Sequence, residues 1–208
     1  MSRWSAYAWS HMREGSFPAL ARGGTLGGSQ AGVKIAYRLA GGERPPSLYG
    51  RLASPLGGGC AEAALGLEIQ PLAALPLRLA VERRQALGRG GRSDFAFLVH
   101  GGVDAMALPR GARLEGYGQA GMVGLEEEDL FADGALRITV PAGEGVRLGG
   151  GPWGAAQPGA ARLDIGPSVS LDLAAAGRTM RLQADWRLRI AGDAAPASGP
   201  ALTVATDF

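Results

Sequence analysis

Hydrophobic and polar residues alternate one by one along most of this chain. In the clearest stretch, residues 181–190, the apolar set Leu182, Ala184, Trp186, Leu188 and Ile190 alternates with Arg181, Gln183, Asp185, Arg187 and Arg189. Successive side chains leave an extended strand on opposite faces, whereas a helix would spread the charges around its circumference. We therefore predict a strand with one apolar face and one charged face.

Twelve segments show this alternation or a diluted form of it. The first, seventh and ninth are the weakest, because aromatic residues on both faces or runs of glycine interrupt the pattern. Clusters of Gly and Pro between the segments, such as 41–46 and 141–145, are typical of turns. No segment has the pattern of a long amphipathic helix, so the predicted class is all-β. The predicted strands are 3–12, 30–39, 47–54, 61–70, 76–84, 94–103, 112–123, 133–140, 145–154, 162–173, 179–190 and 200–208.

Two architectures give strict alternation. A soluble sandwich or barrel turns its apolar face inward, whereas a transmembrane barrel turns that face to lipid and its polar face to the lumen. The polar face here carries many small residues between nearly balanced charges, as in Glu82 beside Arg84 and Asp185 beside Arg187. A narrow lumen favours such a composition, because the strands converge there. We therefore expect a closed, antiparallel, up-and-down transmembrane barrel of about twelve strands.

Strand length and the chain end favour the same architecture. Most segments have 8–12 residues, close to the 9–11 that a tilted strand needs to cross a bilayer. Leu202, Val204, Thr206 and Phe208 share one face, and a final aromatic residue resembles the signal that outer-membrane barrels present to their assembly machinery. With both ends in the periplasm, the external connections would be longer on average than the others. Those connections are 13–29, 55–60, 85–93, 124–132, 155–161 and 191–199.

Composition narrows the function classes. Among 208 residues, Gly numbers 35, charged residues make up 19%, and the net charge is +2, which is no nucleic-acid signature. No stretch of 18 residues lacks charge, so a helical membrane protein is excluded, and one cysteine excludes an intramolecular disulfide. No signal-peptide pattern opens the chain. We therefore expect a single barrel domain over 1–208, its 1–29 region least defined, from the C-terminal part of a longer exported protein.

Several short strings resemble one family of barrels. They are residues 36–39 (AYRL), 48–52 (LYGRL), 64–72 (ALGLEIQPL), 79–84 (LAVERR), 117–121 (YGQAG) and 184–187 (ADWR). In this order they resemble the C-terminal outer-membrane barrel of the bacteriophage adsorption protein A family and, more distantly, the barrel of the cellulose-export outer-membrane subunit. The resemblance covers most of residues 28–208. The helical tetratricopeptide array that usually precedes such barrels is not in this sequence. The resemblance implies a role in exopolysaccharide secretion or phage reception.

Few residues suggest catalysis or a cofactor. Gly116, Gly118 and Gly121 match the spacing of a dinucleotide fingerprint, but the next residues continue a strand where that motif needs a helix. His11 and His100 are too few for a metal site, and no nucleophile elbow accompanies them. The acidic run 126–129 lacks the spacing of a calcium loop. We expect no enzyme activity, no cofactor and no metal.

The charges on the polar faces are the most informative set. They form either a self-neutralising structural network or a basic conduit that selects anionic solutes or polysaccharide. A twelve-stranded barrel falls between the filled eight-stranded and the open sixteen-stranded ones. Twelve basic and seven acidic residues are expected in the lumen together with His100: Lys34, Arg38, Arg51, Glu62, Glu68, Arg78, Glu82, Arg84, Arg113, Glu115, Arg137, Arg147, Arg162, Asp164, Asp172, Arg181, Asp185, Arg187 and Arg189.

The leading hypothesis is therefore a non-enzymatic barrel of the bacterial outer membrane. It would anchor or form an export channel for exopolysaccharide, or serve as a phage-adsorption surface. Its partners would be the lipid bilayer and the barrel-assembly machinery, with polysaccharide or phage, and no nucleic acid. Two alternatives stay open, an autotransporter-type translocator, in which residues before about 28 thread the pore, and a soluble ligand-binding β-barrel.

Overall fold

The computed structural model describes residues 2–13, 28–42, 44–88, 93–125, 129–175 and 178–207, and these form twelve strands and one short 3-10 turn. In these residues no helix is long and apolar enough to span a membrane. The strands are β1 (Trp4–Arg13), β2 (Gln30–Arg38), β3 (Ser47–Pro55), β4 (Glu62–Ile69), β5 (Leu77–Ala86), β6 (Phe95–Ala107), β7 (Arg113–Val123), β8 (Asp129–Pro141), β9 (Val146–Gln157), β10 (Ala160–Ala175), β11 (Arg178–Gly192) and β12 (Gly199–Asp207), with η1 (Pro109–Gly111) between β6 and β7.

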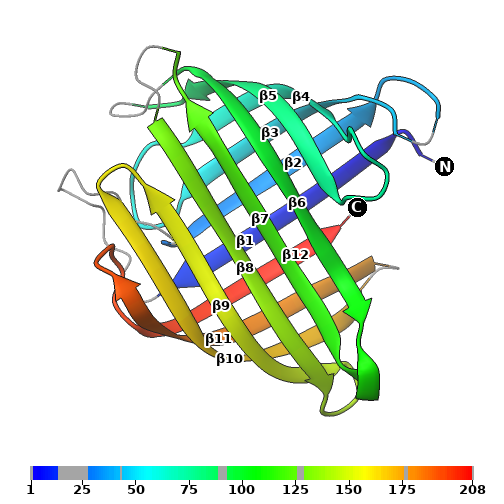
Figure 1. Ribbon diagram of the computed structural model, residues 1–208, viewed down its shortest axis with the longest axis vertical. Helices are drawn as coiled ribbons and strands as arrows, with labels where there is room; N and C mark the ends of the chain where they lie inside the picture. Colours follow the sequence, from blue (N-terminus) through cyan, green and yellow to red (C-terminus); the bar gives the residue numbers. More distant parts are fainter. Residues whose placement is uncertain are drawn as a thin grey trace.

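The strands close into one antiparallel barrel in which each strand pairs with its neighbours in the chain. The first strand closes the ring by pairing with the last, with Trp9 opposite Ala205 and Ser10 opposite Val204. Figure 1 shows this seam, where the blue strand β1 lies beside the red strand β12. Closure leaves no unpaired sheet edge. The predicted fold class, a closed twelve-stranded antiparallel barrel, is therefore confirmed.

All twelve predicted segments are strands, but several ends differ. Strand β8 begins at Asp129, so this residue of the acidic run belongs to a strand, while 126–128 lie outside the described residues. The connection predicted over 155–161 is only the pair 158–159, because Gly159, with φ +75°, closes a two-residue turn. The expectation of a long connection there is wrong.

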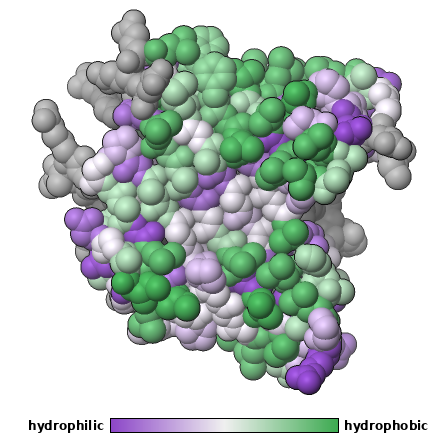
Figure 2. Space-filling view, in the orientation of Figure 1, coloured by the Kyte–Doolittle hydropathy of each residue, from purple (hydrophilic) through white to green (hydrophobic). Residues whose placement is uncertain are grey.

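The apolar side chains cover the outside of the barrel. Leu67, Leu79, Ile165 and Leu188 are 45–47% exposed although they lie in the middle of paired strands. Figure 2 shows hydrophobic residues spread across the visible face, with paler residues between them. Most of the alternate positions are buried or half-buried, and they carry charges such as Glu68, whose exposed fraction is 2%. The molecule therefore has the reverse of a soluble protein's polarity.

Three interior glycines lie beneath aromatic rings of the neighbouring strand. The pairs are Trp9 with Gly32, Tyr49 with Gly66, and Phe131 with Gly121, each directly opposite in the register. In each pair the ring would collide with, or closely crowd, a Cβ atom placed on the glycine. Aromatic residues that cover strand glycines in this way help to fix the register.

The Tyr49–Gly66 pair gives a first prediction. A Cβ atom on Gly66 would lie 2.6 Å from Cζ of Tyr49 and 2.8 Å from Cβ of Glu82. We expect Gly66→Val to lower the free energy of unfolding by about 1–3 kcal/mol through overpacking. Urea unfolding of the detergent-folded barrel measures this loss of free energy. The matched control is Gly50→Val in the adjacent strand, where nothing lies within 4 Å of the added Cβ. Equal losses in both variants would contradict the packing argument.

Candidate functional site in the barrel interior

One interior cluster surrounds Glu82 of β5, which is 2% exposed. Its Oε1 accepts hydrogen bonds from Nη2 of Arg51 at 2.9 Å and Nε of Arg84 at 2.7 Å, and its Oε2 accepts one from the Tyr49 hydroxyl at 2.7 Å. Arg51 also reaches Oε1 of Glu62 at 2.6 Å. Alternation places all these residues on one face of β3, β4 and β5, so three neighbouring strands share one network.

A second cluster surrounds Glu68 of β4. Nζ of Lys34 lies 2.6 Å from its Oε2, Nη1 of Arg78 lies 2.7 Å from its Oε1, and Nε2 of His100 lies 3.3 Å from Oε2. The Lys34 ammonium also lies 4.1 Å from the centre of the Tyr49 ring, which connects this cluster to that of Glu82. These contacts connect strands β2, β4, β5 and β6.

Both carboxylates are removed from water, which is unfavourable for an isolated charge. Several charged donors on each carboxylate offset that desolvation, as a buried ion pair requires. This half of the interior is therefore a network of paired charges that connects neighbouring strands.

On the other half, Arg181 of β11 connects distant strands. Its Nη1 lies 3.2 Å from Oε1 of Glu115 on β7, and its Nε lies 2.7 Å from Oδ1 of Asp172 on β10. Glu115 also accepts from Nη2 of Arg137 on β8 at 2.9 Å. Since β7 and β11 are not neighbours, the Arg181–Glu115 pair crosses the interior rather than following the wall.

Asp185 of β11 is fully paired within the interior. It accepts hydrogen bonds from Ser168, Gln183 and Arg187, at distances of 2.7–3.1 Å. The Arg187 guanidinium lies 4.7 Å from the centre of the Trp153 ring, a cation–π contact. Arg187 is thus held between a carboxylate and an aromatic face.

Another interior network surrounds Asp164, which is 1% exposed. Arg13 and Arg162 both pair with it, the Arg13 Nη1 at 2.8 Å and the Arg162 Nη2 at 2.8 Å. The same arginines reach the β11–β12 connection, where Arg162 donates to the carbonyl of Ala194 and Arg13 donates to that of Ala197. Ala194 is 6% exposed, so this connection packs into the barrel mouth.

Most sequence-predicted lumen residues enter these networks, but a few lie at the strand ends. Arg38 is exposed and Arg113 is half-buried, while Arg78 is exposed but still pairs with Glu68. Arg147 bonds Thr139 and the carbonyl of Gly111, and Arg189 donates to the carbonyls of residues 193 and 194. The predicted assembly signal, Phe208, lies outside the described residues.

Several interior side chains were not predicted from the sequence, among them Tyr49, Asp133 and Arg13. Tyr49 and Asp133 share the faces of Arg51 and Arg137, so alternation alone could have placed both inside. Arg13 follows the first predicted segment, whose weak alternation gave no face to assign.

No part of the interior in the described residues has a cofactor motif. Gly116, Gly118 and Gly121 all lie within strand β7, which continues to Val123, so the spacing carries no phosphate-binding turn. In the same residues, no three His, Cys, Asp or Glu side chains group as metal ligands would.

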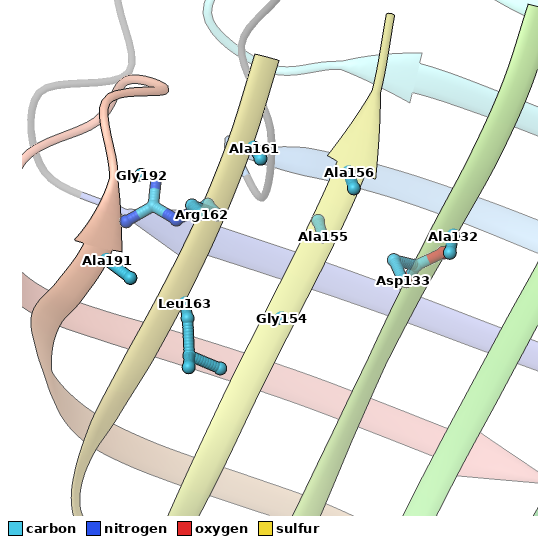
Figure 3. A pocket seen from close by; sticks show the side chains of 10 residues that line it. All are labelled: Ala132, Asp133, Gly154, Ala155, Ala156, Ala161, Arg162, Leu163, Ala191 and Gly192. Atoms are coloured by element: carbon cyan, nitrogen blue, oxygen red, sulfur yellow. The ribbon is translucent and has the colours of Figure 1, made fainter.

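The outer wall has a shallow apolar hollow of about 350 Å³ over β8 to β11. Figure 3 shows Leu163 beside it, with Arg162 directed to the other side of the strand. Small outward residues make the hollow, because they leave the wall without side-chain bulk. These are Ala132, Gly154, Ala156, Ala161 and Ala191.

Comparison with known proteins gives structural neighbours only. No protein-family model matches the chain and no curated protein matches it, so the resemblance to the bacteriophage adsorption protein A family has no family model behind it. Among solved structures, the chain is similar to the beta domain of the Bordetella autotransporter BrkA, at 14% identity and a TM-score of 0.39, over 99% of this chain and 97% of that one. It is also similar to OmpT, an outer membrane protein of Vibrio cholerae in its trimer form, at 8% identity and a TM-score of 0.36, with the same coverages.

Proposed function

We propose that this chain is a non-enzymatic transmembrane β-barrel of the bacterial outer membrane. The observation that carries the proposal is the reversed polarity, with Leu, Ile and Val side chains exposed on every side and paired charges inside. Water would leave that exterior unfavourably solvated, whereas hydrocarbon is its natural surrounding. A closed barrel also satisfies every strand's backbone hydrogen bonds, which a bilayer demands.

Two tryptophans on opposite faces allow a direct test. Trp186 points outward and is 52% exposed, whereas Trp153 points inward and is 6% exposed. In single-tryptophan variants folded into vesicles, we expect brominated lipid to quench Trp186 strongly and Trp153 little. The folded form should also migrate differently from the heated form on a gel. A monomer that stays soluble without detergent, with Trp186 unquenched in the vesicles, would overturn the proposal.

The finer role proposed is an anchor or export channel for exopolysaccharide, or a phage-adsorption surface. Its support is the family resemblance in the sequence together with an interior richer in arginine than in carboxylates. A basic interior favours anionic solutes over cations. Planar-bilayer recordings in a salt gradient test the channel form, and we expect a reversal potential of the sign given by anion selectivity. A barrel that is cation-selective or does not conduct would contradict the channel hypothesis. The anchor hypothesis would then be tested by measuring whether deletion strains lose surface polysaccharide.

A further inference from the structure

Two aromatic residues of β1 present a continuous ring surface to the interior. The rings of Tyr7 and Trp9 are stacked, with centres 5.6 Å apart and planes inclined by 16°. Tyr7 lies opposite Lys34 in the register, and partners in a register point to the same side of the sheet. Because Lys34 reaches the buried Glu68, Tyr7 faces the barrel interior.

A hydrogen-bonded group of one tyrosine, one carboxylate and one carboxamide lies on the opposite wall. The Tyr117 hydroxyl donates to Oδ2 of Asp133 at 3.1 Å, and the Gln119 carboxamide donates to Oδ1 of the same carboxylate. In the register, Tyr117 pairs with Ala135, which in turn pairs with the buried Trp153. Tyr117 therefore also faces the interior.

These two groups face each other across the lumen. Five strands separate β1 from β7 in either direction around the ring, so the two are diametrically opposed. Tyr7 and Tyr117 therefore point into the lumen from opposite walls. The aromatic side chains thus narrow the lumen from both walls.

The space between them is accessible to solvent. Tyr117 is 55% exposed and Tyr7 is 40% exposed, although both point inward, whereas the interior acids Glu82 and Asp164 are exposed by 2% or less. Inward side chains with such exposure require open space beside them. The interior is therefore closely packed at the ion-pair networks, whereas solvent reaches the inward aromatic residues. We call this second region the aromatic constriction, and it consists of Tyr7, Trp9, Tyr117, Gln119 and Asp133.

We propose that the aromatic constriction binds a sugar ring. The flat faces of Tyr7, Trp9 and Tyr117 suit the apolar C–H face of a pyranose, and the carboxylate and carboxamide of Asp133 and Gln119 suit its hydroxyl groups. A carboxylate near aromatic rings also suits an organic cation, but the Arg187 guanidinium, which lies over the inward Trp153 ring two strands from Tyr117, opposes a further positive charge. The inference rests on the proposed function, in which the barrel handles saccharides in the outer membrane. A saccharide would reach this interior site through an end of the barrel.

The test measures binding to the full chain folded in detergent, using calorimetry with maltohexaose and with a hexamer of galacturonic acid. We expect binding of at least one hexamer, weakened about tenfold by Tyr117→Ala and also weakened by Asp133→Asn. The control is Tyr37→Ala. Tyr37 lies on the outer face of β2, where its ring contacts that of Trp4 at 4.7 Å, so we expect this variant to bind normally. Migration of unheated samples confirms that each variant is folded.

Three results would overturn the inference. They are no binding of either hexamer by the unaltered chain, equal losses in Tyr117→Ala and Tyr37→Ala, or tighter binding of tetraethylammonium than of both hexamers. The same preparations are tested for vesicle insertion. A barrel that inserts but binds no hexamer overturns only the sugar site, whereas one that fails to insert overturns the proposed function.

Discussion

Replacing Glu82 by glutamine is expected to lower the free energy of unfolding by about 3–5 kcal/mol, the usual cost of removing one partner from a buried ion pair. Glutamine keeps the size of the side chain but removes the charge that Arg51 and Arg84 share at 2.9 and 2.7 Å. Among the described residues, Glu62 would then be the one carboxylate still paired with both guanidinium groups, and its distance to Arg84 is 3.9 Å. Equilibrium unfolding in urea, followed by the tryptophan fluorescence of the detergent-folded barrel, measures the loss.

Glu62→Gln is the matched control for this prediction. Glu62 pairs with the same two arginines, but its side chain is 28% exposed where that of Glu82 is 2% exposed. Water can therefore replace part of its interaction, and we expect a loss of about 1 kcal/mol or less. If the two variants lose equal stability, burial is not what makes the Glu82 network important.

The strand pattern and the orientation of the faces could be predicted from the sequence, because both depend on local alternation. In residues 181–190 every second side chain is charged or amide-bearing, and the structure places Gln183, Asp185 and Arg187 inside. The barrel form was predictable for a related reason, since small residues between balanced charges fit a crowded interior better than a solvated face.

The partners of those charges could not be predicted, because they depend on register and closure. Glu115 and Arg181 are 66 positions apart in the chain and meet only because closure of the ring points both side chains of β7 and β11 into one lumen. The inward side of β1 was equally hidden, since Tyr7 and Trp9 share its interior face with His11 while Trp4 lies on the other face. The strand ends were missed where a short turn such as 158–159 allowed pairing to continue.

The outward face provides the second large prediction, Ile165→Arg. Ile165 is 45% exposed and lies in β10 between the interior residues Asp164 and Gly166. In water, an arginine at so exposed a position would change stability by no more than about 0.5 kcal/mol. In hydrocarbon, the same arginine is expected to cost about 2–4 kcal/mol, falling toward the interfaces. The sign and size of this one change therefore distinguish a lipid-facing wall from a solvated one.

The experiment compares unfolding free energies in lipid vesicles for the unaltered chain, Ile165→Arg and the control Leu56→Arg. Leu56 is 49% exposed but follows the end of β3, outside the strands, so its arginine can reach water. We expect a loss of at least about 2 kcal/mol for Ile165→Arg and less than about 1 kcal/mol for Leu56→Arg. Equal, small effects at both positions would mean that Ile165 meets water, and the apolar exterior would then need a protein partner to cover it.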